Sequence, residues 1–349
     1  MLIKESLSAI LVENGKPLAI DTLRLPDRLK TGQVLVKLIT SGICGAQLNE
    51  IDAVKGPDRF LPHLLGHEGF AEVLEVSPDS KKVAVGDHVV LHWRPGTGIE
   101  SETPRYLLGN QVVNAGWVTT FNQFAVVSEN RITKIKSSIN SHFAPLLGCA
   151  LTTSIGVLEN DAKVNYRDSL LISGFGGVGS ALLQFARFLR VRSVIILEKD
   201  ERKREEALRQ GANYFISASN FDHCKRQLDD ICLRIGRPSV ALETTGNARM
   251  IELCYEKSAD QARVILVGVP ALNDKASIYT LPLHFGKVLK GSKGGDSKPD
   301  IDIPMIESLI ESNDIKPENF VTHTFKFADI NRAIQSLRNG IIGRIILEF

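Results

Sequence analysis

The sequence predicts an α/β protein of two domains, one β-rich and one built on a doubly wound parallel sheet. The chain has 349 residues, more than twice the roughly 150 of a typical domain. Short apolar runs separated by turn-forming stretches dominate about the first 130 residues, whereas β-branched runs alternate with helical segments after about residue 144. We therefore expect residues 1–145 to form the first domain, completed by 289–349, and residues 146–288 to form the second.

Individual elements follow from the same patterns. In the first domain, apolar runs bounded by turn residues indicate strands at 34–40, 71–76 and 88–92. In the second domain, strands are expected at 169–173, 193–198, 214–217, 239–243 and 263–269, and helices from 178, from about 201 and at 221–235. The last part of the chain is mixed, with helices expected at 301–312 and 328–339 and a strand at 343–349.

The composition indicates a globular, cytoplasmic protein and leaves small molecules open as its partners. Lys and Arg number 42 and Asp and Glu 40, and this net charge of +2 gives no electrostatic reason to expect nucleic acid or a membrane surface as partner. Five cysteines without a close pair are typical of a reducing compartment. Lys4 and Glu5 stand where an export signal would need an unbroken apolar core.

A glycine-rich loop is the strongest local motif. Gly174, Gly176 and Gly179 form GxGxxG directly after an apolar run and before a segment with helical spacing. In a dinucleotide site, the first glycine permits the tight turn, the second lets the backbone approach a pyrophosphate, and the third lets the helix pack on the strand. The helix N-terminus adds N–H groups and positive potential for the phosphates.

The strand after this loop ends in an acid, Glu198. A carboxylate at this place accepts hydrogen bonds from the adenosine ribose hydroxyls and repels a 2′-phosphate, so NAD is favoured over NADP. The nearby Lys199 and Arg202 leave room for NADP. On the residues alone, a second interpretation stays open, in which the glycines serve only a turn and Glu198 is simply exposed.

Three possible metal ligands lie far apart in the chain. Cys44 is part of SGICG, His67 of LLGHEG and Cys149 of LLGCALTT. No local spacing links them, and each taken alone is most often a small buried hydrophobe or a satisfied polar residue. Sequence spacing by itself therefore does not assemble a zinc site.

Along nearly its whole length, the chain resembles the medium-chain dehydrogenase/reductase superfamily, specifically its zinc-dependent alcohol dehydrogenase branch. The matching pieces are SGICG, LLGHEG, VGDHVV, LLGCALTTSIG, GFGGVG, the acid-ended strand with Lys203 after it, RVILVGVP, GSKGG and THTFKFADINRAIQSLRNG followed by Arg344. The resemblance implies a GroES-like β-rich catalytic domain and a Rossmann domain, in agreement with the two domains predicted from periodicity.

The resemblance also implies a catalytic site. One zinc ion would be held by Cys44, His67 and Cys149, with Glu68 beside the metal as a supporting or transient ligand. Two thiolates, an imidazole and an open fourth position form a recognised catalytic zinc set. The implied cofactor-binding residues are Thr153 and Val178 at the nicotinamide, Lys203 near the ribose and Arg344 near the pyrophosphate, together with Gly174, Gly176, Gly177, Gly179, Glu198, Val267 and Val269.

The implied activity is hydride transfer between an alcohol and NAD, giving an aldehyde or ketone, with zinc as the Lewis acid. A homodimer or homotetramer is the implied assembly. The chain departs from the family where many members carry a hydroxyl residue and a histidine that relay the alcohol proton, because Ala46 and Asn49 stand there. A route through Thr152, His92 or water is a hypothesis. Gln47 replaces the aspartate that commonly supports the histidine ligand.

The stretch where many relatives bind a structural zinc contains no cysteine from residue 86 to 126, so one catalytic zinc and no structural zinc is expected. A long polar and aromatic loop occupies this stretch. Its Trp93 is the predicted wall of the substrate pocket, and polar groups at Gln47, Asn49 and His92 favour a polar or polyol-like alcohol.

Two other functions are compatible with these residues. A zinc-free medium-chain reductase of quinones or activated double bonds would explain Ala46 and Gln47 as signs of a decayed metal site, but the retained ligand set argues against it. The other is a non-catalytic dinucleotide-binding protein that keeps the fold without turnover.

Overall fold

The computed structural model describes residues 3–136 and 138–349. The chain folds into two compact units. The first unit consists of Met1–Cys149, Lys298–Glu311 and Phe320–Phe349, and the second of Ala150–Ser297 and Ser312–Asn319. The boundaries expected from the sequence lie at 145/146 and 288/289. The second boundary lies nine residues later because residues 288–291 form a strand of the parallel sheet of the second unit.

The first unit is mainly β-structure. Strands β1, β2, β7, β8 and β4 close a barrel, and a seven-stranded sheet has the order β10-β6-β5-β3-β18-β17, with β9 paired to β3. The strands are β1 (Glu5–Leu11), β2 (Ala19–Arg24), β3 (Gln33–Ile43), β4 (His63–Leu64), β5 (Glu68–Val76), β6 (His88–His92), β7 (Arg105–Leu108), β8 (Gln111–Asn114), β9 (Phe124–Ser128), β10 (Ile132–Lys134), β17 (Val321–Lys326) and β18 (Arg344–Glu348). The helices are α1 (Gly45–Ile51), α2 (Ala144–Leu147), α8 (Pro299–Glu311) and α9 (Ile330–Arg338), with short 3₁₀ turns η1 (Glu129–Arg131) and η7 (Phe327–Asp329).

The end of the chain completes the sheet that the beginning starts. Strand β18 pairs antiparallel with β3, with Ile345 opposite Ile43, and β17 lies parallel to β18. The strands expected at 34–40, 71–76 and 88–92 are β3, β5 and β6. The hairpin of β7 and β8 was not predicted, because its four-residue strands fall inside the stretch that the sequence analysis treated as a loop.

One carboxylate at the start of helix α8 contacts three separate segments of this unit. Asp300 Oδ2 accepts hydrogen bonds from the backbone N–H of Thr97 at 2.5 Å and from its hydroxyl at 2.8 Å. Asp300 Oδ1 lies 2.6 Å from Lys82 Nζ and accepts from the Thr133 hydroxyl at 2.8 Å. Burial opposes ionisation, but the hydrogen bonds from Lys82 and Thr97 lower the pKa of Asp300 to about 2.

We expect Asp300→Asn to lower the free energy of unfolding by about 1 kcal/mol at pH 7, less than a fully buried charged hydrogen bond because the site is partly exposed. The folded-state pKa lies below the unfolded value of about 3.9, so this contribution is present above about pH 4 and is lost as the pH falls towards 2. Urea unfolding at pH 7, 5 and 3 measures it. Asp230→Asn, at an exposed position of another helix, is the control. A difference from wild type that persists unchanged at pH 3 would contradict the prediction.

The second unit has a six-stranded sheet in which every pairing is parallel, in the order β13-β12-β11-β14-β15-β16. The chain moves outward from β11 to β13 and then continues on the other side from β14. This reversal defines a doubly wound sheet with a switch point between β11 and β14. The strands are β11 (Ser169–Ser173), β12 (Ser193–Glu198), β13 (Tyr214–Ser217), β14 (Val240–Glu243), β15 (Arg263–Leu266) and β16 (Val288–Gly291). The predicted fold class is confirmed.

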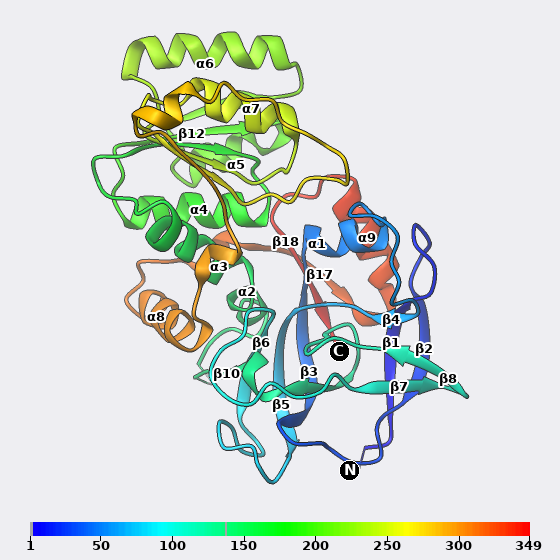
Figure 1. The fold of residues 1–349 in the computed structure, drawn as a ribbon. Coiled ribbons are helices and arrows are strands. Elements are labelled where there is room, and N and C mark those ends of the chain that lie inside the picture. The colour runs from blue at the N-terminus through cyan, green and yellow to red at the C-terminus, as the bar shows by residue number, and fades with distance from the viewer. Residues whose placement is uncertain (1–2, 137) are drawn as a thin grey trace. The chain divides into compact units, whose positions relative to one another are not determined.

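Helices cover both faces of this sheet, with α6 and α7 on one side and α4 on the other (Figure 1). Apolar side chains of α6 and α7 pack with those of the strands in one buried cluster. Helix α7 was not predicted from the sequence. The helices are α3 (Ala150–Gly156), α4 (Gly177–Phe188), α5 (Arg204–Arg209), α6 (Phe221–Ile235) and α7 (Ala248–Lys257), with the π-helical turn η2 (Val157–Asp161) and the 3₁₀ turns η3 (Glu201–Lys203), η4 (Leu281–Phe285), η5 (Gly294–Asp296) and η6 (Pro317–Asn319).

Candidate active site

Folding of the first unit brings four ligand-type side chains together. The ligand atoms of Cys44, His67, Glu68 and Cys149 all lie within 4.8 Å of one another. Cys44 follows β3 and precedes α1, Glu68 begins β5 with His67 before it, and Cys149 follows α2. Three separate segments of the chain therefore supply one cluster, which matches the ligand set implied by the resemblance.

Close packing of backbone fixes the position of Cys149. A Cβ atom on the preceding residue, Gly148, would collide with the carbonyl oxygen of Leu91 in β6. Only glycine allows α2 to end this close to β6, and the next residue is thereby held against the strand that pairs with β5.

The two sulfurs of the cluster are close enough to share a proton. The hydrogen bond with Cys149 lowers the pKa of the Cys44 thiol well below its usual value, against the effect of burial, and His67 lowers it further. Burial opposes the protonation of His67, but its contact with Cys44 raises the pKa of the imidazole. A thiolate facing an imidazole that holds its proton is the arrangement that a divalent cation would replace, because metal ligands bind in their deprotonated forms.

Glu68 is completely buried, and only one of its two carboxylate oxygens accepts a hydrogen bond in the described part of the chain. Its Oε2 forms an ion pair with Arg344, which is also buried. Its Oε1 lies 3.7 Å from His67 Nε2 and has no hydrogen-bond partner among the residues that the structure describes. A buried oxygen without a donor, beside two sulfurs and an imidazole, fits a divalent metal with a preference for sulfur and nitrogen ligands, and zinc is such a metal.

Gln47 occupies the place of the supporting aspartate and contacts the same ring. It is buried in α1, its Nε2 lies 2.5 Å from His67 Nδ1, and its Oε1 accepts the backbone N–H of Cys44 at 2.9 Å. The amide thus links two predicted ligands and holds the imidazole with its Nε2 towards Glu68.

The proposed proton route through His92 is not supported by its contacts. His92 is fully buried, its Nδ1 lies 2.7 Å from the carbonyl oxygen of Arg94, and its Nε2 lies 2.9 Å from the hydroxyl of Thr133. Burial lowers the pKa of His92 to about 4. Both ring nitrogens are therefore engaged outside the ligand cluster. Thr152 lies in α3 of the second unit, so its part of the hypothesis stays a prediction.

A cavity of about 600 Å³ in the first unit is lined by His67 and by the predicted pocket wall, Trp93. Its lining also includes the aromatic side chains of Phe60 and Trp117 and, at one side, Arg131. Cavities of this size are typical of small-molecule sites, and apolar walls with a few polar groups are their usual lining.

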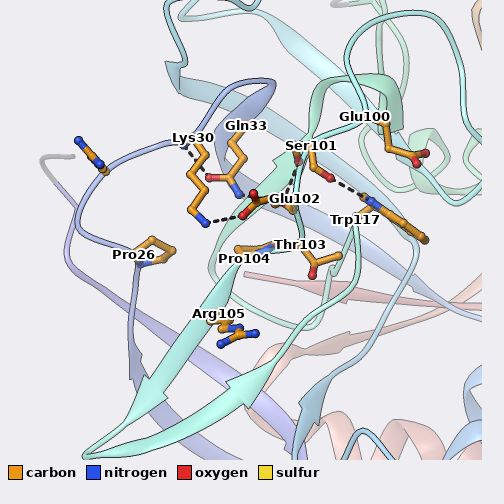
Figure 2. Close-up of a pocket in the computed structure, with 11 residues that line it drawn as sticks. Pro26, Lys30, Gln33, Glu100, Ser101, Glu102, Thr103, Pro104, Arg105 and Trp117 are labelled. Carbon is orange, nitrogen blue, oxygen red and sulfur yellow. Dashed lines mark hydrogen bonds and ion pairs between the residues drawn. The ribbon is translucent and has the colours of Figure 1, made fainter.

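A second cavity, of about 830 Å³, lies on the other side of residues 103–105, which line both cavities. Figure 2 shows how its wall is held together. Lys30 pairs with the Glu102 side chain at 2.5 Å, and the Trp117 ring nitrogen donates to the carbonyl oxygen of Ser101 at 3.1 Å. None of the predicted catalytic or metal-binding residues lines this second cavity within the described ranges.

The glycine loop lies at the switch point of the second unit, between β11 and α4. Gly174 has a φ of +93°, which a side chain would disfavour. A Cβ on Gly179 would collide with the carbonyl oxygen of Gly174, whereas one on Gly176 would meet nothing within 4 Å. Gly176 is the N-cap of α4, which begins with Gly177 and Val178. The loop therefore has the open backbone approach and the close helix packing that a dinucleotide site needs.

Glu198 ends β12 beside this loop and is largely buried. Its carboxylate accepts the N–H of Phe175 at 2.8 Å and that of Asp200 at 3.0 Å, and Lys203 Nζ lies 3.2 Å from it. Because an ionised carboxylate has about four acceptor positions, one remains for a ribose hydroxyl.

The other predicted cofactor residues are distributed over both units. Thr153 is buried in α3, Val267 and Val269 follow β15, and Val269 is half exposed. Arg344 belongs to the first unit, where its guanidinium pairs with Glu68. The cofactor contacts assigned to these residues stay predictions.

We expect Glu198→Ala to lower kcat/KM for NAD by about 10- to 100-fold, because a buried acceptor for the ribose is lost, while kcat/KM for NADP falls less. Glu198→Gln, which keeps the shape and one acceptor, should lose less. Initial rates with both cofactors at saturating alcohol give the ratio. An NAD/NADP ratio that stays at the wild-type value in Glu198→Ala would count against the role of Glu198.

Comparisons with known proteins agree with the metal-ligand cluster of the first unit and with the glycine loop of the second. The family model described as alcohol dehydrogenase GroES-like domain matches residues 30–137, and the model described as zinc-binding dehydrogenase matches 177–310. An S-(hydroxymethyl)glutathione dehydrogenase from Escherichia coli O1:K1 is 28% identical over 374 aligned positions, which cover 99% of this chain and 100% of that protein.

Solved structures show the same fold. A benzyl alcohol dehydrogenase from Acinetobacter calcoaceticus has a TM-score of 0.88 at 24% identity, covering 99% of this chain and 100% of that one. An alcohol dehydrogenase from Escherichia coli CFT073, solved with NADH, has a TM-score of 0.81 at 19% identity, covering 99% and 100%. The chain belongs to the zinc-containing medium-chain alcohol dehydrogenase family, as the sequence motifs predicted. It is an NAD-dependent, alcohol dehydrogenase-like oxidoreductase.

Proposed function

We propose that this protein is a dehydrogenase that uses one zinc ion per chain and NAD to interconvert an alcohol and its aldehyde or ketone. The observation that carries the proposal is the cluster of Cys44, His67, Glu68 and Cys149 within 4.8 Å. When bound, zinc supplies Lewis acidity that favours the deprotonated alcohol oxygen, and NAD supplies the hydride acceptor.

The residues in and around the cluster supply the ligand atoms and the charge that a divalent cation requires. Cys44, His67 and Cys149 provide the sulfur and nitrogen ligands, and Glu68 provides a buried carboxylate oxygen without a donor. Arg344 balances the charge of Glu68 from the other side. Gln47 contacts the imidazole at Nδ1, and Nε2 lies on the side of the ring that faces Glu68.

The alcohol is proposed to occupy the 600 Å³ cavity that His67 and Trp93 line. The preference for a polyol-like alcohol was based on Gln47, Asn49 and His92. Of these, only Gln47 lines this cavity in the described part of the chain, and both polar ends of its amide are already engaged.

Metal analysis combined with an absorbance assay tests the proposal. Protein purified without chelator should contain about one zinc per chain, and NAD reduction at 340 nm should appear with at least one member of a panel of aliphatic, aromatic and polyhydric alcohols. Two zinc ions per chain would contradict the single site. A chelator should abolish turnover, and added zinc should restore it.

A zinc-free reductase of quinones or activated double bonds is the second candidate, favoured by Ala46 and Gln47 at positions where family members carry other residues. This function predicts that the purified protein contains no metal, that it oxidises NADH with a quinone, and that a chelator does not change the rate. This result would replace the first proposal.

We also propose a homo-oligomer in the cytoplasm. Strand β16 ends the parallel sheet, pairing with β15 on one side, and apolar side chains nearby are exposed. These exposed residues are Val269, Leu272, Tyr279, Phe285 and Val288. An unpaired edge with apolar neighbours favours association with a second copy. Light scattering at the exit of a sizing column measures the mass.

No helix in residues 3–136 or 138–349 has the length and apolarity needed to cross a bilayer.

A further inference from the structure

We propose that Arg131 is the positioning residue of the alcohol pocket: it fixes Trp93 and Trp117, and the pocket that they form selects alcohols carrying an aromatic ring over small aliphatic alcohols. This inference rests on the proposed function, since it assigns the substrate class of the same site. It concerns a residue that takes no part in the predicted metal or cofactor contacts.

Arg131 contacts both tryptophans of the chain and the loop between them. One terminal nitrogen donates to the carbonyl oxygen of Trp93 at 2.5 Å, and the other pairs with Glu100 at 2.9 Å. The guanidinium carbon lies 5.0 Å from the centre of the Trp117 ring, within the range of a cation–π contact. A planar guanidinium that meets three partners at once leaves little freedom to any of them.

The burial of the Arg131 side chain is unfavourable by itself. Arg131 is 6% exposed, and its Nε has no hydrogen-bond partner among the described residues. A buried arginine with an unsatisfied nitrogen is unfavourable unless its other contacts compensate. The contacts that compensate are those to Trp93, Glu100 and Trp117. Of these three residues, Trp93 and Trp117 line the cavity, so the contacts that stabilise buried Arg131 also fix part of the cavity wall.

The same loop is held from its other side. Trp117 donates to the carbonyl oxygen of Ser101, and Glu102 pairs with Lys30, as Figure 2 shows. The segment 93–104 is thus held near its start by the hydrogen bond from Arg131 to Trp93 and near its end by the contacts of Ser101 and Glu102. Loss of Arg131 removes the contact at Trp93, which is the one inside the alcohol cavity.

The lining of the cavity matches an aromatic substrate. Phe60, Trp93 and Trp117 contribute rings, and Leu64, Leu65 and Val118 contribute aliphatic surface. Polar and charged side chains, among them Glu50, Asp58 and Arg105, line the rest of the cavity. Aromatic rings gain from offset or edge contacts with other rings beyond the area they bury, whereas ethanol has no surface to use them. The cavity, about 600 Å³, is also much larger than a two-carbon alcohol requires.

Tryptophan fluorescence tests the positioning directly, because the chain has two tryptophans and both line this cavity. In Arg131→Met, we expect the emission maximum to move to longer wavelength and acrylamide quenching to increase, since the Trp117 ring loses its cation–π partner and the backbone of Trp93 loses a hydrogen bond. Arg131→Lys keeps the charge but cannot reach Trp93 and Glu100 together, so it should fall between wild type and Arg131→Met. Unchanged emission and quenching in Arg131→Met would overturn the proposal.

Kinetics test the substrate class. Wild type should prefer benzyl alcohol to ethanol in kcat/KM, and in Arg131→Met this preference should fall about tenfold, mainly through the KM of benzyl alcohol. A merely structural role would lower both values of kcat/KM together with the thermal midpoint. An equal loss for the two alcohols, or a wild type that prefers ethanol, would therefore overturn the proposal.

Arg167→Met is the matched control, because Arg167 also stacks on an aromatic ring, that of Tyr166, but belongs to the second unit and lines neither cavity. It should leave the emission and the alcohol preference at wild-type values. The fluorescence measurements need neither metal nor turnover. If wild type oxidises no alcohol, the proposed function fails, while the emission of Arg131→Met still decides whether Arg131 positions the tryptophans.

Discussion

Cys44→Ser is expected to lose its zinc and to lower kcat/KM for the alcohol about 1,000-fold, equivalent to about 4 kcal/mol of transition-state stabilisation. The reason is the loss of the anionic sulfur. In the wild-type cluster the contact with Cys149 lowers the pKa of Cys44, so this sulfur is the first to become a thiolate. A serine hydroxyl stays protonated at neutral pH and is a poor zinc ligand. Zinc content by mass spectrometry and initial rates measure the two effects.

The control for this experiment is Cys232→Ser, at a partly buried cysteine in α6 of the second unit, which should keep both zinc and activity. NADH binding, followed by nucleotide fluorescence, should be retained in Cys44→Ser because the glycine loop lies in the other unit. A Cys44→Ser protein that keeps full zinc and full turnover would end the case for this cluster as the active site.

The parts of the fold that sequence predicted well are those specified by local patterns. The glycine loop, the acid at position 198 and the helix expected at 221–235 depend on neighbours within one turn or one strand. Hydrophobic periodicity and turn residues report such neighbours directly. For the same reason the short hairpin of β7 and β8 was missed, because four-residue strands in a polar stretch carry too few periods to be recognised.

The site was predicted only as far as the family motifs reach. Spacing alone could not bring Cys44, His67 and Cys149 together, and the resemblance supplied that step. Two arginines that contact the site, Arg344 at the ligand cluster and Arg131 at the neighbouring cavity, were not predicted in these roles. Arg344 stands 276 positions from Glu68, and Arg131 stands 38 from Trp93. Ion pairs between distant segments leave no periodic signal, so only the folded chain identifies them.

Arg344→Met is expected to destabilise the metal-free protein by about 3–5 kcal/mol, because it leaves the carboxylate of Glu68 buried without its cation. The double variant Glu68→Gln with Arg344→Met should recover at least about 2 kcal/mol of this loss, since the amide carries no charge to be left unpaired. Urea unfolding in the presence of a chelator measures all three proteins, so that no bound cation takes the place of Arg344.

The matched control is Arg338→Met. Arg338 also makes a two-pronged ion pair, with Asp52, at 2.5 and 2.7 Å, but both side chains are about one-third exposed. Water solvates the remaining carboxylate there, so the expected loss is at most about 1 kcal/mol. The two arginines differ mainly in burial, and the comparison therefore isolates the cost of an unpaired buried charge. Equal losses of unfolding free energy in Arg344→Met and Arg338→Met would show that Glu68 either becomes solvated or takes up a proton when Arg344 is removed. Arg344 would then not be the residue that keeps this carboxylate ionised beside the metal ligands.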